Sequence, residues 1–515
     1  MKPIRLISGF LTVGFWTLAS RVLGFVREIL ILAYIGPGPV MDAFVAAFRL
    51  PNMFRRFFAE GAFNAAFVPM FSKKYEGGED ATGFARDALN GLALVVLALT
   101  ALAMLFMPAF VWATAEGFSG DARFDLTVGY GRILFPYIVF MSLAALFSGV
   151  LNATGHFAAA AAAPVLLNIF VVLAMVMANL LGQQVIDWLL WSIPLAGVAQ
   201  LTLVWRAAGR AGIRLRPGRP RWSPDMRAML VIALPAALSS GVLQINLLVG
   251  QLVASGTENA LSWLYAADRL YQLPLGVVGI AIGIVLLPSL SRSLKAGDHS
   301  AAQSSLSRAG EAALALTLPA AVALVVIPVP LVMVLFERGQ TGPSDTQAIA
   351  LAVMIYGAGL PAFVLQKVLQ PLYFAREDTR TPLRYAVVSM VVNAAVAIGL
   401  AFYIGWLASA VATTLAAWVQ VALLAAGRRP MGETARFDAR FGQKLWRIIA
   451  AAGLSGGVMW AAMQQLAPLL AMPTWRYGAL AVLIAVGIAG YFALAQALGA
   501  LSLGDLRASL RRRRG

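Results

Sequence analysis

Charged residues inside the hydrophobic segments are the part of this sequence that could do chemistry. In the first two segments, five arginines stand beside three acidic residues: Arg21, Arg27, Arg49, Arg55, Arg56, Glu28, Asp42 and Glu60. A charge at the centre of a bilayer costs a few kcal/mol even on lenient scales, so these side chains must face protein or water. Arginine binds phosphate oxygens through paired hydrogen bonds. The surplus of two positive charges therefore predicts an anion site that suits a diphosphate.

Helical spacing indicates which charges in the second segment already have partners. Asp42, Arg49 and Arg56 follow one another at intervals of seven and share one helix face. Pro51 makes this alignment approximate. Arg56 and Glu60 lie four residues apart, so a plain ion pair explains them as well as ligand binding does.

Arg21, Arg27 and Arg55 are the strongest candidates for anion binding, because none has an unclaimed acidic partner at helical spacing. Arg21 shares a face with Glu28, and Arg27 points elsewhere unless the helix bends at Gly24.

Other charges within the hydrophobic segments have simpler explanations. Asp268 and Arg269 are adjacent, and they suit a lock between helices as well as contact with a substrate. Arg132 and Lys367 lie near segment ends, where long basic side chains reach the membrane surface.

Composition excludes most other classes of protein. The 515 residues are 60% hydrophobic and 12% charged, with a mean hydropathy of +0.79, which excludes a soluble domain. There is no cysteine and there are two histidines, so we expect no disulfide, metal centre or other cofactor. The net charge of +17 could suggest nucleic acid, but the basic residues lie between hydrophobic segments, as in membrane proteins.

The elements that must position these charges are membrane-spanning helices, because a helix needs about 20 apolar residues to cross the hydrocarbon. We predict an all-α integral membrane protein with about fourteen spans, at 8–35, 40–71, 87–113, 127–151, 159–182, 187–205, 228–254, 260–290, 311–336, 347–374, 385–404, 406–426, 448–468 and 477–499. The first span is expected to be retained, because no signal-peptidase site follows it.

The distribution of lysine and arginine fixes the orientation of these spans. With the N-terminus inside, the inner loops and termini hold 29 basic residues and the outer loops hold three, Arg123, Arg338 and Arg476. Basic residues collect on the cytoplasmic side of membrane proteins. We therefore expect both termini in the cytoplasm.

The two halves of the chain show an internal duplication. Pro69, Ser72 and Gly78 match Pro288, Ser291 and Gly297 at a constant offset of 219 residues. Matched segments with the same orientation predict parallel repeats around a central site. The predicted organisation is an N-terminal lobe of six helices, a cytoplasmic Arg-rich linker, a C-terminal lobe of six helices, and two last helices with a basic tail, at 1–205, 206–227, 228–426 and 427–515. The linker contains RPGRPRWSP, which cannot be helical throughout, and it would let the lobes rock.

Several motifs resemble the MurJ/MviN lipid II flippase family of the MOP exporter superfamily. They are SRVLGFVRE at 20–28, MDAFVAAFRLPNMFRRFFAEGAFNAAFVP at 41–69, YAADRL at 265–270, GIVLLPSLS at 283–291 and FAREDTRTP at 374–382. The resemblance covers essentially the whole chain. It implies two six-helix lobes around a cationic cavity, with the last two helices forming a groove for the polyprenyl tail. It also implies functional roles for Arg21, Arg27, Asp42, Arg55 and, from the second lobe, Arg269.

Two positions differ from what the resemblance implies. Gln272 stands where family members often carry glutamate, and it cannot supply a carboxylate for coupling there. Members with a sodium site use acidic and amide ligands, and here Asn393 has no acid beside it. Coupling to the membrane potential or to a monovalent cation stays open.

The expected function is translocation of lipid II across a bacterial inner membrane by alternating access. The expected partners are lipid II, membrane lipids and possible peptidoglycan synthesis proteins, and no nucleic acid. One alternative is a flippase for another polyprenyl-diphosphate-linked oligosaccharide. A second is a MATE-type drug exporter, which would need an acidic cavity. A third is an intramembrane glycosyltransferase, which would need acidic catalytic residues.

Overall fold

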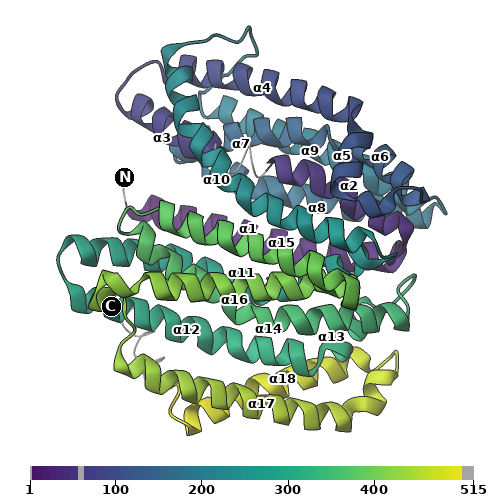
Figure 1. Cartoon of the computed structure of the whole chain (residues 1–515). Helices are drawn as coiled ribbons and strands as arrows, with labels where there is room; N and C mark the ends of the chain where they lie inside the picture. Colours follow the sequence, from purple (N-terminus) through teal and green to yellow (C-terminus); the bar gives the residue numbers. More distant parts are fainter. Residues whose placement is uncertain (1–2, 56–62, 502–515) are drawn as a thin grey trace. The chain divides into compact units, whose positions relative to one another are not determined.

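The computed structural model describes residues 3–55 and 63–501, and these residues form helices without strands. They divide into two compact units. The first unit comprises 1–262 and 338–341, and the second comprises 263–337 and 342–515. Figure 1 labels the helices along the chain.

The first unit contains a bundle in which α1 packs against α8, α8 and α7 pack against α9, and α2 packs against α6. Its helices are α1 (Pro3–Tyr34), α2 (Pro39–Arg55), α3 (Phe63–Glu76), α4 (Ala81–Leu105), α5 (Met107–Thr114), α6 (Ala122–Leu134), α7 (Tyr137–Ala153), α8 (Phe157–Leu180), α9 (Val185–Arg210) and α10 (Pro224–Ser255), with a short 3-10 turn η2 (Glu116–Phe118).

In the second unit, α14 packs against α12 and α16, α15 packs against α16, and α17 lies beside α18 and α12 (Figure 1). Its helices are α11 (Ala260–Lys295), which begins in the first unit, α12 (His299–Val326), α13 (Pro328–Phe336), α14 (Pro343–Phe374), α15 (Arg380–Ile404), α16 (Leu407–Gly427), α17 (Ala439–Ala471) and α18 (Arg476–Ala497), with the 3-10 turns η3 (Arg429–Met431) and η4 (Glu433–Ala435).

The all-helical membrane fold is confirmed, whereas the count of fourteen spans is not. Among the described residues, ten helices are long and apolar enough to cross a membrane. Three spans predicted as single helices and lying wholly within the described residues are divided: 87–113 into α4 and α5, 127–151 into α6 and α7, and 311–336 into α12 and α13. In the first and last of these, a proline, Pro108 or Pro328, lies in the first turn of the second helix, where its missing N–H group is tolerated.

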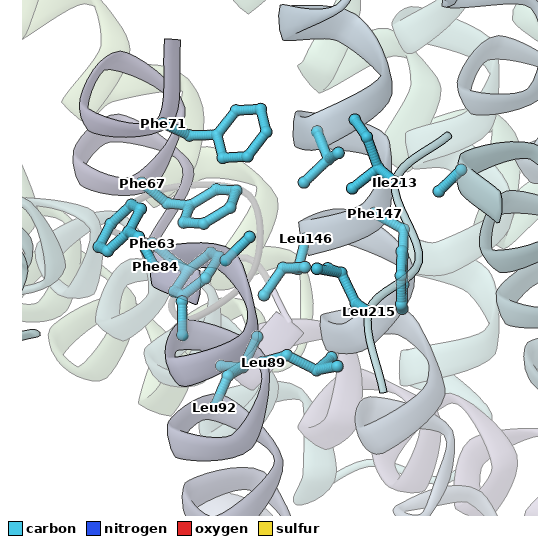
Figure 2. Packing of buried hydrophobic residues seen from close by; sticks show 14 of the residues in the cluster. Phe63, Phe67, Phe71, Phe84, Leu89, Leu92, Leu146, Phe147, Ile213 and Leu215 are labelled. Carbon is cyan, nitrogen blue, oxygen red and sulfur yellow. The ribbon is translucent and has the colours of Figure 1, made fainter. Parts of the chain in front are cut away.

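The Arg-rich linker is not helical over 213–223, between α9 and α10, as its prolines predicted. Ile213 and Leu215 are buried in a cluster with Phe67, Phe84 and Phe147, and Figure 2 shows both side chains within it. Helix α10 packs against α3, α4 and α5. The linker and α10 therefore both belong to the first unit, and the compact units divide at Ser262 rather than within 206–227.

The predicted duplication has a local structural counterpart in each unit. Gly78 and Gly297 have φ angles of +69° and +67°, in the left-handed region that favours glycine. Each is followed by an aspartate that caps the next helix: Asp80 accepts from the N–H of Gly83, and Asp298 accepts from the N–H of Ala301. The same left-handed glycine thus follows α3 and α11, and an aspartate cap starts the next helix two residues after Gly78 and one residue after Gly297.

Candidate functional site

Arg27 is held by side chains from two helices of the first unit. Its Nη1 atom donates to Oδ1 of Asn168 on α8 at 3.0 Å, and its Nη2 atom donates to Oε1 of Glu28. The side chain of Arg27 is 15% exposed and that of Glu28 is 3% exposed. The spacing had placed Glu28 on the face of Arg21, whereas in the structure Glu28 pairs with its neighbour Arg27. Helical spacing missed Glu28 because adjacent residues point about 100° apart, and the long arginine side chain spans that angle.

Asn168 is itself fixed in place. Its Nδ2 atom donates to the backbone oxygen of Ser20 at 2.9 Å and lies 3.3 Å from the Ser20 hydroxyl. Because both functions of the amide are used, its oxygen faces Arg27 in one orientation. Asn168 was not among the residues predicted from the sequence. The available signal was an amide in the interior of the apolar run that forms α8, whose other amide, Asn179, lies in its last turn.

Arg21 lies on α1 seven residues before Glu28 and is exposed. Among the described residues it has no hydrogen-bond or ion-pair partner, and Glu28 instead pairs with Arg27. Arg21 is thus available for an external anion.

Arg55 and Arg49, both on α2, have different surroundings. Arg55, in the last turn of α2, lines a cavity of the first unit. Arg49 lies 3.5 Å, at the limit of a hydrogen bond, from the backbone oxygen of Leu247. Arg56 and Glu60 lie outside the described residues, so their predicted pairing stays a prediction.

Asp42 is fully buried in a polar network of the first unit. Its carboxylate accepts from the backbone N–H of Ser262 at 2.9 Å and from the Ser262 hydroxyl at 2.5 Å. Arg123 contributes a third contact at 3.5 Å and also binds Asp121, with 2.6 Å between Nε and Oδ2. Arg123 was expected in an outer loop, yet it is 5% exposed. The structure thus gives Asp42 protein partners in place of open access to a ligand.

The candidates of the second unit form local contacts on α11. Asp268 accepts a hydrogen bond from Nε2 of Gln272, one helical turn later. The guanidinium of Arg269 lies 4.3 Å from the centre of the Tyr265 ring. Asn393 is 1% exposed, with both polar atoms unpaired among the described residues. No cluster of acidic or histidine side chains in the described part of the chain could hold a metal ion.

Comparison with known proteins decides the family. A family model described as lipid II flippase MurJ matches residues 31–486. The chain is 42% identical over 521 residues to a probable lipid II flippase MurJ of Rhizobium tropici, covering 99% of this chain and 98% of that one. Identity to the corresponding protein of Rhizobium meliloti (strain 1021) is 44%, covering 99% and 97%. The chain belongs to the MurJ lipid II flippase family.

Solved structures agree on the fold. The structure titled "Lipid II flippase MurJ, inward closed conformation" matches with a TM-score of 0.80 at 23% identity, covering 94% of this chain and 98% of that one. An inward-facing MATE multidrug transporter of the MOP superfamily matches with a TM-score of 0.69 at 14% identity, covering 81% and 95%. Together with the family match, which makes the protein a transporter, they confirm the predicted MurJ family and its fold.

Proposed function

We propose that this protein moves lipid II from the cytoplasmic to the periplasmic leaflet of a bacterial inner membrane by alternating access. The observation that carries the proposal is the identity of 42% and 44%, over nearly the full length, to proteins named as probable lipid II flippases. The cationic side chains of the first unit suit the diphosphate of that substrate. The polyprenyl chain stays in lipid during the movement.

Each arginine has a distinct part in this proposal. Arg21 and Arg27 bind diphosphate oxygens, and Asn168 and Glu28 fix the guanidinium of Arg27 in advance, which reduces the entropy lost on binding. Arg55 contributes from α2. In the second unit, Arg269 supplies a further cation, with Asp268 beside it in sequence.

The buried contacts of Asp42 support a positioning role in place of direct substrate binding. Arg49 and Glu60 are secondary candidates for contact with the headgroup.

The membrane potential is a sufficient driving force in this proposal. Moving one negative charge outward is favoured by about 2.3 kcal/mol per 100 mV when the outside is positive. The surplus of basic residues in the predicted inner loops supports cytoplasmic termini. No resident cofactor is part of the proposal.

Arg27→Ala tests the function. We expect lipid II translocation in spheroplasts to fall at least about tenfold, because a charge-assisted contact to a phosphate contributes roughly 1.5 to 3 kcal/mol. Arg132→Ala is the matched control, since Arg132 is an intramembrane arginine whose Nε atom donates to the Met104 backbone oxygen. Undiminished translocation by Arg27→Ala would contradict the site assignment.

A flippase for another polyprenyl-diphosphate-linked oligosaccharide is the second candidate, because arginines recognise the shared diphosphate. Depleting the protein and identifying the lipid-linked precursor that accumulates on the cytoplasmic leaflet separates the two. Accumulation of a precursor other than lipid II would favour the second candidate.

A further inference from the structure

A cavity of about 570 Å³ lies inside the first unit, where α2, α3, α7, α8 and α9 meet. Its volume falls within the range of about 300 to 1,000 Å³ that is usual for small-molecule sites. Its polar side chains are Arg55, Asn64, Ser148, Asn152 and Gln200, and the rest of its wall is apolar.

The chemistry of the lining favours a neutral, hydroxyl-rich ligand next to one negative charge. Arg55 is the one charged residue among the described residues of the wall, and the other polar groups are amides and a hydroxyl. A diphosphate alone would leave those amides unused, whereas sugar hydroxyl and acetamido groups both donate and accept hydrogen bonds. Gln200 shapes the cavity and is not assigned to the ligand, because its amide already has protein partners. It donates to the oxygen of Ala163 at 2.9 Å and accepts from the hydroxyl of Tyr137 at 3.3 Å.

Asn64 gives an independent indication that this cavity receives a ligand. Its Oδ1 atom is buried and has no hydrogen-bond partner in the described part of the chain. An acceptor left in this state costs folding free energy unless a ligand or water satisfies it. Asn64 lines the cavity, so a bound donor could reach it.

Small residues keep the space open. The wall includes Ala144, Ala145, Gly149 and Ala160. A Cβ atom on Gly149 would lie 3.0 Å from Cγ2 of Val68 and 3.5 Å from Oδ1 of Asn64. A side chain at position 149 would therefore fill the cavity beside Asn64.

We propose that this cavity binds a sugar ring of the lipid-linked headgroup, with Arg55 on the neighbouring phosphate and Asn64 and Asn152 on the sugar. The inference rests on the proposed function and adds a subsite to it. The cavity lies where α7 ends and α8 begins, and the positive-inside pattern assigns that end to the cytoplasmic side, where the substrate is loaded.

The experiment measures binding of three lipids to the purified full-length protein: lipid II, the same lipid without its peptide, and undecaprenyl diphosphate, which has no sugar. Asn64→Leu removes the amide and keeps the side-chain size. We expect its affinity for both sugar-bearing lipids to fall about tenfold, with an unchanged affinity for undecaprenyl diphosphate. Its melting temperature should be equal to or above that of the wild type, because an unsatisfied buried acceptor is removed.

Gly149→Val fills part of the cavity and so tests whether the ligand needs that space. Gly129→Val is its control, because a Cβ atom on Gly129 meets no atom within 4 Å. Asn152→Leu, at an exposed position of the wall, gives a second measurement if the glycine variant fails to fold.

Each outcome decides between the two proposals. In the first outcome, the wild type binds lipid II, and the variants Asn64→Leu and Asn152→Leu bind it as tightly as the wild type does. Only the sugar subsite is then refuted. The sugar subsite is also refuted if these variants lose affinity for undecaprenyl diphosphate to the same degree as for lipid II. It is refuted as well if they lose affinity for lipid II but not for its peptide-free form. If the wild type binds no lipid II, the proposed function fails and the subsite fails with it.

Discussion

Arg27 illustrates how neighbouring side chains orient a single cation inside a membrane protein. Glu28 neutralises part of its charge, and Asn168 fixes one edge of the guanidinium. The contact with Ser20 fixes Asn168 in turn. A phosphate would then meet an oriented fork of donors, so less side-chain entropy is lost on binding.

Asn168→Leu should separate orientation from charge. We expect translocation to fall about tenfold, because a hydrogen bond to a charged group contributes roughly 1.5 to 3 kcal/mol, while Arg27 keeps its charge. The readout is the dependence of the transport rate on lipid II concentration, which should show weaker apparent binding. Asn179→Leu makes the same change at an exposed position of α8 and should transport normally. Equal rates for both variants would contradict the orienting role.

At the scale of elements, the Arg-rich linker is anchored in the core of the first unit, because buried and exposed side chains alternate along it. Leu215 is 2% exposed, whereas Arg214 and Arg216 on either side are exposed. Leu215→Ala should lower the free energy of unfolding by about 2 to 5 kcal/mol, the usual cost of truncating a buried leucine. Thermal unfolding in detergent measures this, with Arg216→Ala as the control. A melting temperature equal to that of the control would show that the linker is not anchored in the core.

Lys74 connects the end of α3 to the start of α10. Its Nζ atom lies 2.9 Å from Glu79 and 3.2 Å from Asp225. These hydrogen bonds raise the pKa of Lys74, and Lys74 lowers the pKa of Glu79 below its ordinary 4.5. A raised lysine pKa contributes stability that is lost as pH rises through it, and a lowered carboxyl pKa contributes stability that is lost as pH falls through it.

Lys74→Met should therefore lower the melting temperature slightly, by a constant amount between about pH 6 and pH 9. The effect should shrink in high salt, because these charges lie near the protein surface. Lys73→Met is the control, since Lys73 is the exposed neighbour of Lys74. A difference between Lys74→Met and the wild type that varies across this pH range would contradict the assignment.

Elements repeated in the sequence were the most predictable part of the fold. The pair Gly78 and Gly297 marked a left-handed glycine in both halves, because a left-handed turn and the cap after it depend on local residues. Contacts across helices were not predictable in this way. The pairing of Asp42 with Arg123 and of Arg27 with Asn168 joins residues 81 and 141 positions apart, and spacing along one helix carries no information about them.

For the whole molecule, the orientation in the membrane is a prediction that can be tested with cysteine labels, because the chain has no native cysteine. Gln184→Cys and Ser300→Cys both lie at exposed positions, in a predicted outer and inner loop. A membrane-impermeant maleimide should label Gln184→Cys in intact spheroplasts and Ser300→Cys only after permeabilisation. The reverse pattern would place the termini outside.

The path of the chain between the two units has a mechanical consequence. The chain passes from one unit to the other at Ser262–Trp263, Glu337–Arg338 and Thr341–Gly342, whereas the Arg-rich linker starts and ends within the first unit. The linker therefore joins two parts of the first unit and does not connect the two units. Any hinge between the units must use those three crossings, and the first of them lies in the opening turn of α11, where bending would cost helical hydrogen bonds.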